Sequence, residues 1–466
     1  MPKKKTALTI EERLQQALVP AEEQPYEVPE NWVWVRLGAF AENISKGTTP
    51  KGGSAAYVDE GVNFLRVENL TSDGYISHSK IAHITEEMHE NYLKRSILKT
   101  NDLLISIAGS LGKSAIVREC DLPINTNQAI AFVRLFADKI DVNYIRNTIE
   151  SPLINSVLTK QTKVTSIPNL TLEIIKNCPI PLPPLSEQQR IVERIEELFA
   201  KLDEAKERLQ EVADSFAVRK AAILHKAFTG ELTKQWRREN GVSDESWEEK
   251  NLGDVCTVNP KKIDAKNLDD NLEVSFVPMA AVSDVFGEIV NHEVKNLQDV
   301  RTGFTNFSEG DVIFAKITPC MENGKSAIVG PLVNDIGYGS TEFYVLRCKE
   351  ELYNKYLYHM VRNTTFRAEA KAVMTGAVGQ QRVPKTFLQE YQLLLPSLPE
   401  QHEIVRLIDE LLARERAAQQ AAEQALASID LMKKSILARA FRGELGTNKA
   451  SEASALELLQ QVLAEN

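Results

Sequence analysis

A tandem duplication organises this chain and constrains its fold more than any other sequence feature. The segment Ala-Phe-Thr-Gly-Glu-Leu at residues 227–232 recurs as Ala-Phe-Arg-Gly-Glu-Leu at 440–445, and Glu187-Gln188 recurs as Glu400-Gln401, both 213 residues apart. A repeat of this length is a domain-scale unit, because solenoid repeats span only about 20–50 residues. We therefore predict two similar halves related by a pseudo-twofold axis.

Each half contains a globular unit followed by a long helix. Short apolar runs separated by Gly, Asn and Ser fill residues 32–184 and are typical of mixed strands and helices. Four prolines between 179 and 184 close this part, and no Gly or Pro follows from Ser186 until Gly230. The pattern predicts one helix of roughly 40 residues, about 60 Å long at 1.5 Å per residue.

Both long helices carry an apolar stripe with the alternating spacing of a coiled coil. The predicted seam of the first comprises Ile191, Ile195, Leu198, Leu202, Ala205, Leu209, Val212, Phe216, Arg219 and Ile223. The predicted seam of the second comprises Ile404, Ile408, Leu411, Glu415, Ala418, Ala422, Ala425, Ile429, Met432 and Ile436. A pseudo-twofold axis requires antiparallel helices, which would place Leu209 and Val212 against Ala422 and Ala418.

These patterns predict an α+β chain of two tandem mixed α/β units separated by two long antiparallel coiled-coil helices. The predicted parts are an N-terminal extension with a short helix at 1–29, a first unit at 30–185, a first helix at 186–230, a linker at 231–246, a second unit at 247–397, a second helix at 398–445 and a C-terminal tail with a short helix at 446–466. A capping box at Thr9 and Glu12 opens the first short helix. The two short helices either dock near each other or remain as frayed tails.

The Gly-Lys-Ser segments at 112–114 and 324–326 are the motifs that most resemble a catalytic one. A phosphate-binding P-loop needs an earlier glycine, where this chain has Ile107 and Pro319. Ala-Ile-Val follows both segments and favours a strand, whereas a P-loop runs into a helix. We favour a loop that carries its lysine toward DNA phosphate or toward solvent.

Other catalytic motifs are not matched. Asn259-Pro260-Lys261-Lys262 departs from the Asn/Asp-Pro-Pro-aromatic tetrapeptide that adenine methyl transfer requires. The histidines and cysteines lack metal-ligand spacing, and no nucleophile motif is present. We therefore predict no catalytic, cofactor-binding or metal site in this chain. The absence of long apolar runs and of a secretory signal predicts a cytoplasmic protein without a membrane segment.

Several loops of both units are rich in the side chains that read base edges in the DNA major groove. Any single loop is also explained as an ordinary polar turn. The net charge of −10 means that partner subunits or local clustering must supply the charge that holds DNA. The candidate DNA-binding residues are Lys46, Thr48, Ser110, Lys113, Asn125, Asn127, Gln128, Lys261, Lys316, Thr318, Glu322, Asn323, Lys325, Ser340, Thr341, Gln380 and Arg382.

Nearly the whole chain resembles the specificity subunits of Type I restriction-modification enzymes. The most specific parts are Pro-Pro-Leu-Ser-Glu-Gln at 183–188, its echo Leu-Pro-Glu-Gln at 398–401, and the Ala-Phe-x-Gly-Glu-Leu segments. In the second unit, residues 317–325, 339–343 and 379–383 look like those of a target recognition domain. The segment before Trp32 is longer than this resemblance leads us to expect.

The resemblance implies a subunit of DNA recognition that is not itself an enzyme. Each target recognition domain would read one half of a bipartite, asymmetric sequence in double-stranded DNA, and the helices would set the gap between the halves. Two modification subunits with S-adenosylmethionine would methylate adenine N6, and two restriction subunits with ATP and Mg would cleave the DNA. Two alternatives stay open, namely a coiled-coil scaffold and an NTP-binding enzyme that uses the Gly-Lys-Ser segments.

Overall fold

The computed structural model describes residues 9–71, 73–136, 139–160, 169–265, 267–377 and 379–465. The chain divides into two compact units. The first unit combines Met1–Arg208 with Ala425–Asn466, and the second unit is Leu209–Gln424. The first unit is thus built from both ends of the chain.

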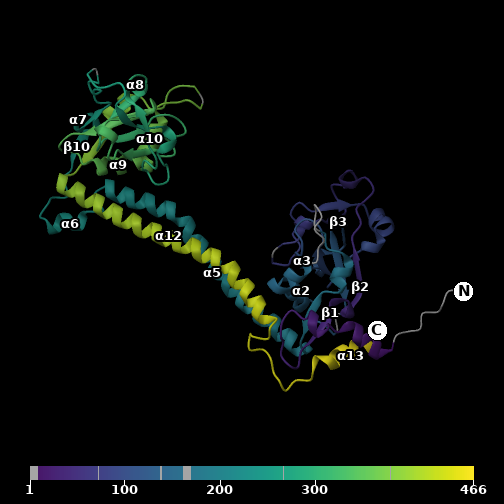
Figure 1. Ribbon diagram of the computed structural model, residues 1–466. Helices are drawn as coiled ribbons and strands as arrows, with labels where there is room; N and C mark the ends of the chain where they lie inside the picture. The colour runs from purple at the N-terminus through teal and green to yellow at the C-terminus, as the bar shows by residue number, and fades with distance from the viewer. Residues whose placement is uncertain are drawn as a thin grey trace. The chain divides into compact units, whose positions relative to one another are not determined.

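Three sheets form the globular part of the first unit, which lies between α1 (Ile10–Ala17) and the long helix α5 (Leu185–Phe228) in sequence (Figure 1). The central sheet has the order β2-β8-β5-β6, the second sheet has the order β4-β3-β7 with β3 and β7 parallel, and β1 pairs with β9. The strands are β1 (Val33–Arg36), β2 (Ala41–Lys46), β3 (Val62–Leu65), β4 (Ala82–Ile84), β5 (Leu103–Ser106), β6 (Ser114–Ile116), β7 (Ile124–Thr126), β8 (Ile130–Leu135) and β9 (Pro179–Leu182). The helices around them are α2 (Val142–Glu150), α3 (Pro152–Lys160) and α4 (Leu172–Lys176).

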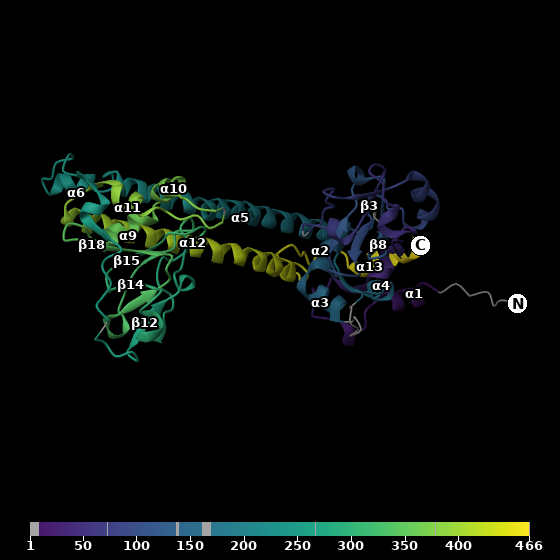
Figure 2. The same ribbon diagram turned by 90° about the horizontal axis from the view of Figure 1, so that it is seen from above.

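The second unit repeats this plan (Figure 2). Its sheets have the orders β11-β18-β15-β16, β13-β12-β17-β14 and β10-β19, and β12 and β17 are again parallel. The strands are β10 (Glu248–Asn251), β11 (Cys256–Val258), β12 (Glu273–Val277), β13 (Glu293–Asn296), β14 (Thr305–Phe307), β15 (Val312–Ala315), β16 (Ser326–Ile328), β17 (Gly337–Gly339), β18 (Phe343–Cys348) and β19 (Gln392–Leu395). The helices are α6 (Lys234–Glu239), α7 (Leu252–Val255), α8 (Leu297–Val300), α9 (Asn354–Arg362), α10 (Thr364–Ala372) and α11 (Lys385–Glu390).

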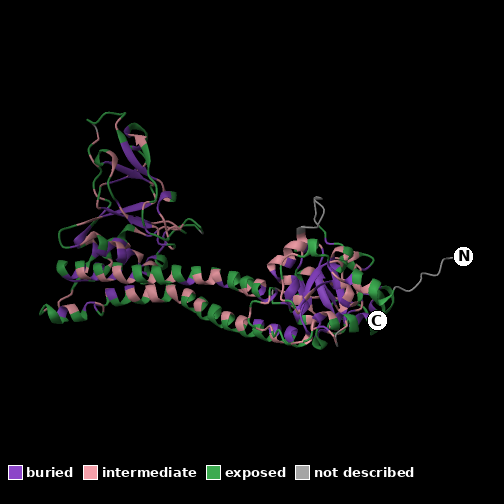
Figure 3. Cartoon of the chain, turned by 60° about the horizontal axis from the view of Figure 1, so that its bottom comes forward, coloured by how far each residue is buried: buried purple, intermediate pink, exposed green. Residues whose placement is uncertain are grey.

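The predicted duplication of a mixed α/β unit is therefore confirmed, down to single ion pairs. Asp102 before β5 accepts two hydrogen bonds from Arg134 of β8, at 2.8 and 2.7 Å. Asp311 before β15 accepts two from Arg347 of β18, both at 2.7 Å. Apolar side chains of the central strands fill the cores, so the strands are buried inside each unit (Figure 3).

Two long helices are present, α5 (Leu185–Phe228) and α12 (Leu398–Ala440). They run antiparallel within each unit. In the first, Lys433 contacts Asp203 at 2.6 Å and Asp430 contacts Lys206 at 3.9 Å. In the second, Arg219 contacts Glu415 at 2.6 Å, and the end of α5 and the start of α12 bury Leu224 and Ile404 in one core. Antiparallel packing is thus confirmed inside each unit. Among the described residues, no helix has both the length and the apolar character needed to cross a membrane.

The predicted seam is right at every second position and wrong at some positions between them. Val212 and Met432 are 41% and 50% exposed, whereas the neighbouring Ala213 and Lys433 are partly buried. The predicted packing of Val212 against Ala418 is wrong because both side chains are exposed. An α-helix drifts about 20° per heptad against a 3.5-residue repeat, so the contact face moves along by one residue.

The duplicated Glu-Gln pairs attach the start of each long helix to the globular part that precedes it in the chain. Gln188 accepts from the backbone N–H of Asp141, at the start of α2, and donates to the carbonyl of Pro183. Gln401 likewise accepts from the N–H of Tyr353, before α9, and donates to Pro396. Both glutamines are fully buried, so this motif positions helices and has no surface to offer DNA.

The Ala-Phe-x-Gly-Glu-Leu segments attach the end of each long helix to the globular part of the other copy. In the second unit, Phe228 at the end of α5 stacks edge to face on Tyr356 of α9, with ring centroids 5.2 Å apart. In the first unit, Phe441 after α12 does the same with Tyr144 of α2, at 5.3 Å. Each unit therefore needs the start of one long helix and the end of the other.

The two short helices at the ends of the chain dock beside each other in the first unit. They are α1 (Ile10–Ala17) and α13 (Ala455–Glu465) (Figure 2). Helix α13 buries Leu459 and Val462 in the same core as Trp32. The capping box is present, since Thr9 and Glu12 exchange hydrogen bonds of 2.9 and 3.2 Å. Of the two alternatives for these segments, docking is the one observed.

Candidate DNA interface

Three loops of the first unit meet at one end of its central sheet. Gly47, after β2, donates its N–H to the carbonyl of Ile130, and Thr48 donates to that of Thr126. A side chain on Gly47 would come within 2.2 Å of the Thr126 carbonyl, so only glycine allows this approach. The N–H of Ile107 donates to Ala129 at 2.8 Å, which adds the loop between β5 and β6. Residues 46–48, 107–113 and 126–129 therefore form one surface.

The second unit gathers its predicted loops in a similar way. The N–H of Lys316 donates to the carbonyl of Glu342, and Thr318 donates through its N–H and hydroxyl to Gln381. Arg382 holds the Glu342 carboxylate with two hydrogen bonds, of 2.7 and 3.0 Å. Segments 316–318, 340–342 and 380–383 are thus joined by backbone and side-chain contacts.

Neighbouring charges and burial shift the pKa values of Glu342 and Lys316 in this second cluster of loops. The hydrogen bonds from Arg382 hold the pKa of the Glu342 carboxyl below its usual range. Burial, reinforced by Arg382 and opposed by Glu342, lowers the pKa of Lys316, whose ammonium lies 5.2 Å from the centre of the Tyr344 ring. The cluster therefore presents a fixed carboxylate between two cations rather than free charges.

The predicted DNA-binding residues divide into three groups by exposure. The exposed ones are Lys46, Ser110, Lys113, Gln128, Lys261, Asn323, Thr341 and Gln380. The partly buried ones, which also contact other parts of the protein, are Thr48, Asn127, Lys316, Thr318, Glu322, Lys325, Ser340 and Arg382. Asn125 is buried. The first group has the polar atoms that can meet DNA without rearrangement, and its contact with DNA stays a prediction.

Asn125 is the clearest correction to the sequence-based prediction. Its amide donates to His89 and to the carbonyl of Leu93, and its oxygen accepts from the N–H of Thr126. The side chain has no exposed surface, because Asn125 lies inside strand β7 and not in a loop. A base contact by Asn125 would leave these buried polar groups unpaired, so the prediction is wrong.

Three charged residues of the second unit have protein partners that the sequence did not indicate. The Lys325 ammonium donates to the carbonyl of Met279 at 3.1 Å, and the Glu322 carboxylate pairs with Lys371 at 2.5 Å. Arg382 holds Glu342, as described above. A contact between one of these side chains and a DNA base would have to replace an existing contact within the protein. In the structure, these side chains therefore hold the loops in place.

The Gly-Lys-Ser segments are turns that lead into strands. Gly112 and Gly324 have φ of +75° and +79°, and strands β6 and β16 begin at Ser114 and Ser326. Both serines are buried, so neither hydroxyl is placed to hold a magnesium ion at the surface. The predicted strands are confirmed, and this geometry does not favour the nucleotide-binding alternative.

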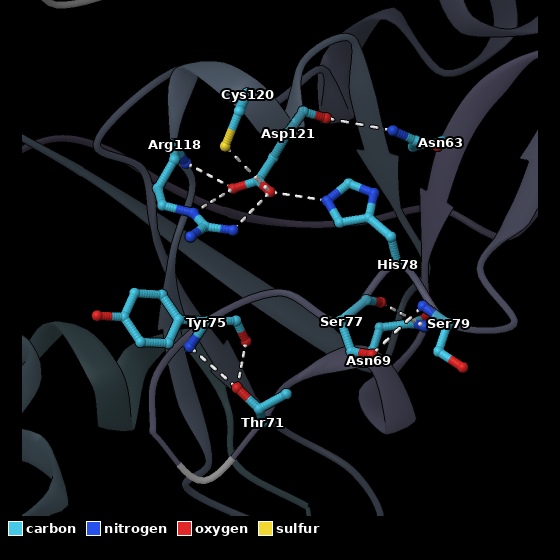
Figure 4. A network of polar contacts seen from close by, with 10 residues as sticks. All are labelled: Asn63, Asn69, Thr71, Tyr75, Ser77, His78, Ser79, Arg118, Cys120 and Asp121. Carbon is cyan, nitrogen blue, oxygen red and sulfur yellow. Dashed lines mark hydrogen bonds and ion pairs between the residues drawn. The ribbon is translucent and has the colours of Figure 1, made fainter.

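A polar network beside the second sheet of the first unit was not predicted from the sequence (Figure 4). The buried carboxylate of Asp121 accepts from the N–H and guanidinium of Arg118 and contacts His78 Nε2 at 2.8 Å. The Arg118 guanidinium lies 5.0 Å from the ring of Tyr75, which is 51% exposed. An aromatic ring and an oriented cation at the surface can stack on a base or meet a phosphate.

The pKa of Asp121 follows from these contacts. Burial opposes ionisation of the carboxyl, but the hydrogen bonds from Arg118 and His78 outweigh it and lower the pKa. The carboxylate therefore stays charged and fixes the arginine. The network joins residues 43 positions apart, from His78 to Asp121. Only the pairing of Arg118 with Asp121, at positions i and i+3, has a local sequence signal.

Comparison with known families gives a match in both units. A family model described as "Type I restriction modification DNA specificity domain" matches residues 29–214 and 244–425. The chain is 32% identical over 263 residues to the Type I restriction enzyme EcoEI specificity subunit of Escherichia coli, covering 47% of this chain and 44% of that protein. It is 38% identical over 187 residues to the EcoAI specificity subunit of the same species, covering 40% and 31%. These matches span less than half the length of either relative.

Longer matches have lower identity. The StySPI specificity subunit of Salmonella potsdam is 24% identical over 462 residues, which covers 94% of this chain and 96% of that protein. The crystal structure of the HsdS subunit from Thermoanaerobacter tengcongensis superposes with a TM-score of 0.64 at 20% identity, covering 91% of this chain and all of that one, and supports the fold. Since the family model matches most of the chain, in both copies, this protein belongs to the Type I restriction-modification DNA specificity family.

Proposed function

We propose that this chain is the DNA specificity subunit of a Type I restriction-modification complex and that each unit reads one half of a bipartite target in double-stranded DNA. One observation carries the proposal. The two units share their topology and their helix joints, yet their corresponding loops present different exposed side chains. Gln128 between β7 and β8 corresponds to Thr341 between β17 and β18, and the loop between β5 and β6 exposes Ser110 where the loop between β15 and β16 exposes Asn323. A shared frame with different polar loops suits the reading of two different half-sites.

The partners and the chemistry belong to the same proposal. Two modification subunits would bind S-adenosylmethionine and methylate adenine N6, and two restriction subunits would use ATP and Mg to translocate and cleave DNA. This chain would supply sequence recognition and take no part in the chemical steps. Its net charge of −10 fits this division, because the partner subunits can contribute the lysines and arginines that neutralise DNA phosphates.

An exchange of recognition parts tests the proposal. Residues 247–395 are replaced by the matching segment of a related specificity subunit, and the methylated sites are mapped by sequencing the host methylome. We expect one half of the bipartite site to change and the other half to stay. A swap that alters both halves together would contradict independent recognition by the two units.

We also propose that the long helices set the gap between the half-sites. Insertion of one heptad into both α5 and α12 lengthens each by about 10 Å, or about three base pairs. Those base pairs also rotate one half-site by roughly 100° about the DNA axis. We expect a longer gap between unchanged half-sites, or loss of target binding. Methylation at the original gap with altered half-site bases would refute this role.

A further inference from the structure

The second unit contains a cavity of about 490 Å³ into which four cations converge. It is lined by helices α5 and α12 on one side and by α9, α10 and the loops at Asp284–Phe286 and Asn323–Gly324 on the other. The cations are Lys220, Arg362, Arg367 and Arg416. None of the four makes an ion pair with any residue that the structure describes, although the carboxylate residues Asp284 and Glu423 also line the cavity.

Two of the cations are held in place by backbone carbonyls. Arg362 donates to Gly324 at 2.7 Å and to Asp284 at 2.9 Å, which joins the two loops. Arg367 donates through Nη1 to the carbonyl of Glu322 at 2.5 Å, while its buried Nε has no acceptor among the described residues. A buried donor without an acceptor costs free energy, so holding the Arg367 guanidinium at the wall of the cavity carries a desolvation cost.

The four cations at this site also repel one another, and burial together with this repulsion lowers the pKa of two of them. Burial, together with Arg362, Arg416 and Arg367, lowers the pKa of Lys220. Burial and Arg362 likewise lower the pKa of Arg367. The folded chain therefore brings like charges together, and the nearby carboxylates of Asp284, Asp409 and Glu423 form no ion pair with them among the residues that the structure describes.

The first unit shows that the fold does not require these cations. At the corresponding positions of the repeat, Lys220 is matched by Lys433 and Arg416 by Asp203, and these two form an ion pair of 2.6 Å. Arg367 is matched by Asn155, whose amide faces Gly112 as Arg367 faces Gly324.

Arg362 is matched by Glu150, which accepts from Ser114 and pairs with Arg146 at 2.8 Å. The same backbone frame thus holds four cations in the second unit, but one lysine, one asparagine and two carboxylates in the first. The excess positive charge is a property of the second unit and not of the joint between helix and recognition part.

We infer that this cavity, hereafter the cation cavity, binds a phosphate group of the DNA backbone next to the half-site that the second unit reads. Asn323 and Gly324, which line it, belong to the segment 317–325 that carries candidate base-reading residues. Phosphate oxygens accept hydrogen bonds from arginine and lysine together, and such contacts fix the register of a protein on DNA. This inference rests on the proposed DNA-recognition function.

The repeat supplies the test variant. The double substitution R367N/R416D gives the second unit the residues that the first unit carries at the same positions, so we expect it to fold. Its matched control, K355D/K385N, makes the same change in net charge at two exposed lysines that do not line the cation cavity. The full chain is assembled with its modification subunits, and binding to a target duplex and a scrambled duplex is measured by fluorescence anisotropy at salt concentrations from about 50 to about 300 mM, a range over which phosphate contacts change affinity strongly.

We expect R367N/R416D to make the plot of log affinity against log salt shallower by about 0.9 for each DNA phosphate that the variant no longer neutralises. The ratio of target to scrambled affinity should stay within about twofold, because a phosphate contact carries no base information. An unchanged slope, or an equal change in the control, would overturn the inference. Calorimetric unfolding checks that both variants keep the transition of the second unit.

Further measurements separate other ligands from DNA. Inorganic phosphate at millimolar concentration should raise the unfolding temperature of the second unit little; a rise abolished by R367N/R416D, with an unchanged DNA salt slope, would assign the cavity to a free anion and overturn our assignment. Loss of modification-subunit binding with an unchanged slope would assign it to an acidic protein surface. Failure of the wild-type assembly to prefer its target duplex would instead refute the proposed function.

Discussion

Arg237 and Glu400 form a buried ion pair that fixes the linker after α5 to the start of α12. Arg237 Nη1 lies 2.7 Å from Glu400 Oε1, and the two side chains are 6% and 0% exposed. Arg237 also donates to the carbonyl of Gly230 and contacts Asp244 at the surface, while Glu400 accepts from Thr233 at 2.7 Å. The substitution Arg237→Met removes the cation and keeps most of the side-chain volume.

The expected cost follows from what remains around the carboxylate. Removing one partner of a buried ion pair typically costs about 3–5 kcal/mol, because the other charge stays buried without compensation. Glu400 keeps its hydrogen bond from Thr233, which places the expected cost near the lower end, at about 3 kcal/mol. For a unit of roughly 200 residues, this corresponds to a fall of about 6–12 °C in the unfolding temperature.

Differential scanning calorimetry of the full chain measures this effect, since the first unit serves as an internal reference. The control Asp244→Asn removes the charge of Asp244, the surface partner of Arg237. Because the Asp244 side chain is 60% exposed, this change should lower the free energy of unfolding by less than about 1 kcal/mol. The double substitution R237M/E400Q removes both charges and should recover at least about half of the loss. A shift below about 2 °C for Arg237→Met, or no recovery in the double variant, would refute this account of the joint.

Three further predictions address the helices, the acidic network and the loop surface. Ile408→Ala removes a fully buried side chain and should lower the free energy of unfolding by about 2–5 kcal/mol. Val212→Ala, at a side chain 41% exposed, should lower it by less than about 0.5 kcal/mol. Equal losses in chemical denaturation would show that Val212 does pack in the helix seam, as the heptad spacing predicts. Asp121 has a lowered pKa in the folded state, so it contributes stability above its unfolded pKa of about 3.9, and this contribution is lost as the pH falls below that value. Asp121→Asn should therefore flatten the pH dependence of unfolding of the first unit between about pH 5 and about pH 2, and an unchanged profile would count against the network. Gly47→Ala forces a side chain against the Thr126 carbonyl and should reduce methylation of the target in vivo, while Gly330→Ala, which has open space, should leave it intact; full methylation in the first variant would show that this loop surface is not needed.

Prediction from the sequence was most successful where the repeat supplied two independent copies of the same element. The long helices begin and end within a few residues of the predicted positions, because prolines precede them and glycines follow them. The residues that form the buried seam of these helices were predicted correctly at alternate positions and wrongly at some positions between them. Apolar residues such as Val212 and Met432 fit the heptad spacing, but the helix face that is buried depends on how far two real helices drift from that spacing.

The site was harder to predict because exposure and pairing are tertiary properties. Asn125 looks like a loop residue in sequence and lies in a buried strand. Arg382 and Glu342 are 40 residues apart, and nothing local shows that they hold each other. Lys113 and Gln128 do lie at exposed positions between strands, as polar loop residues commonly do, and their contact with DNA stays a prediction.

The first unit cannot be completed until the ribosome has made almost the whole chain, since its core includes Phe441 and Leu459. The second unit is a single continuous segment and can fold while synthesis proceeds, although it is encoded later. A premature stop codon after residue 424 would thus spare the second unit and damage the one whose coding sequence comes first. Translation that fails near its end would therefore leave a chain that cannot finish its first half.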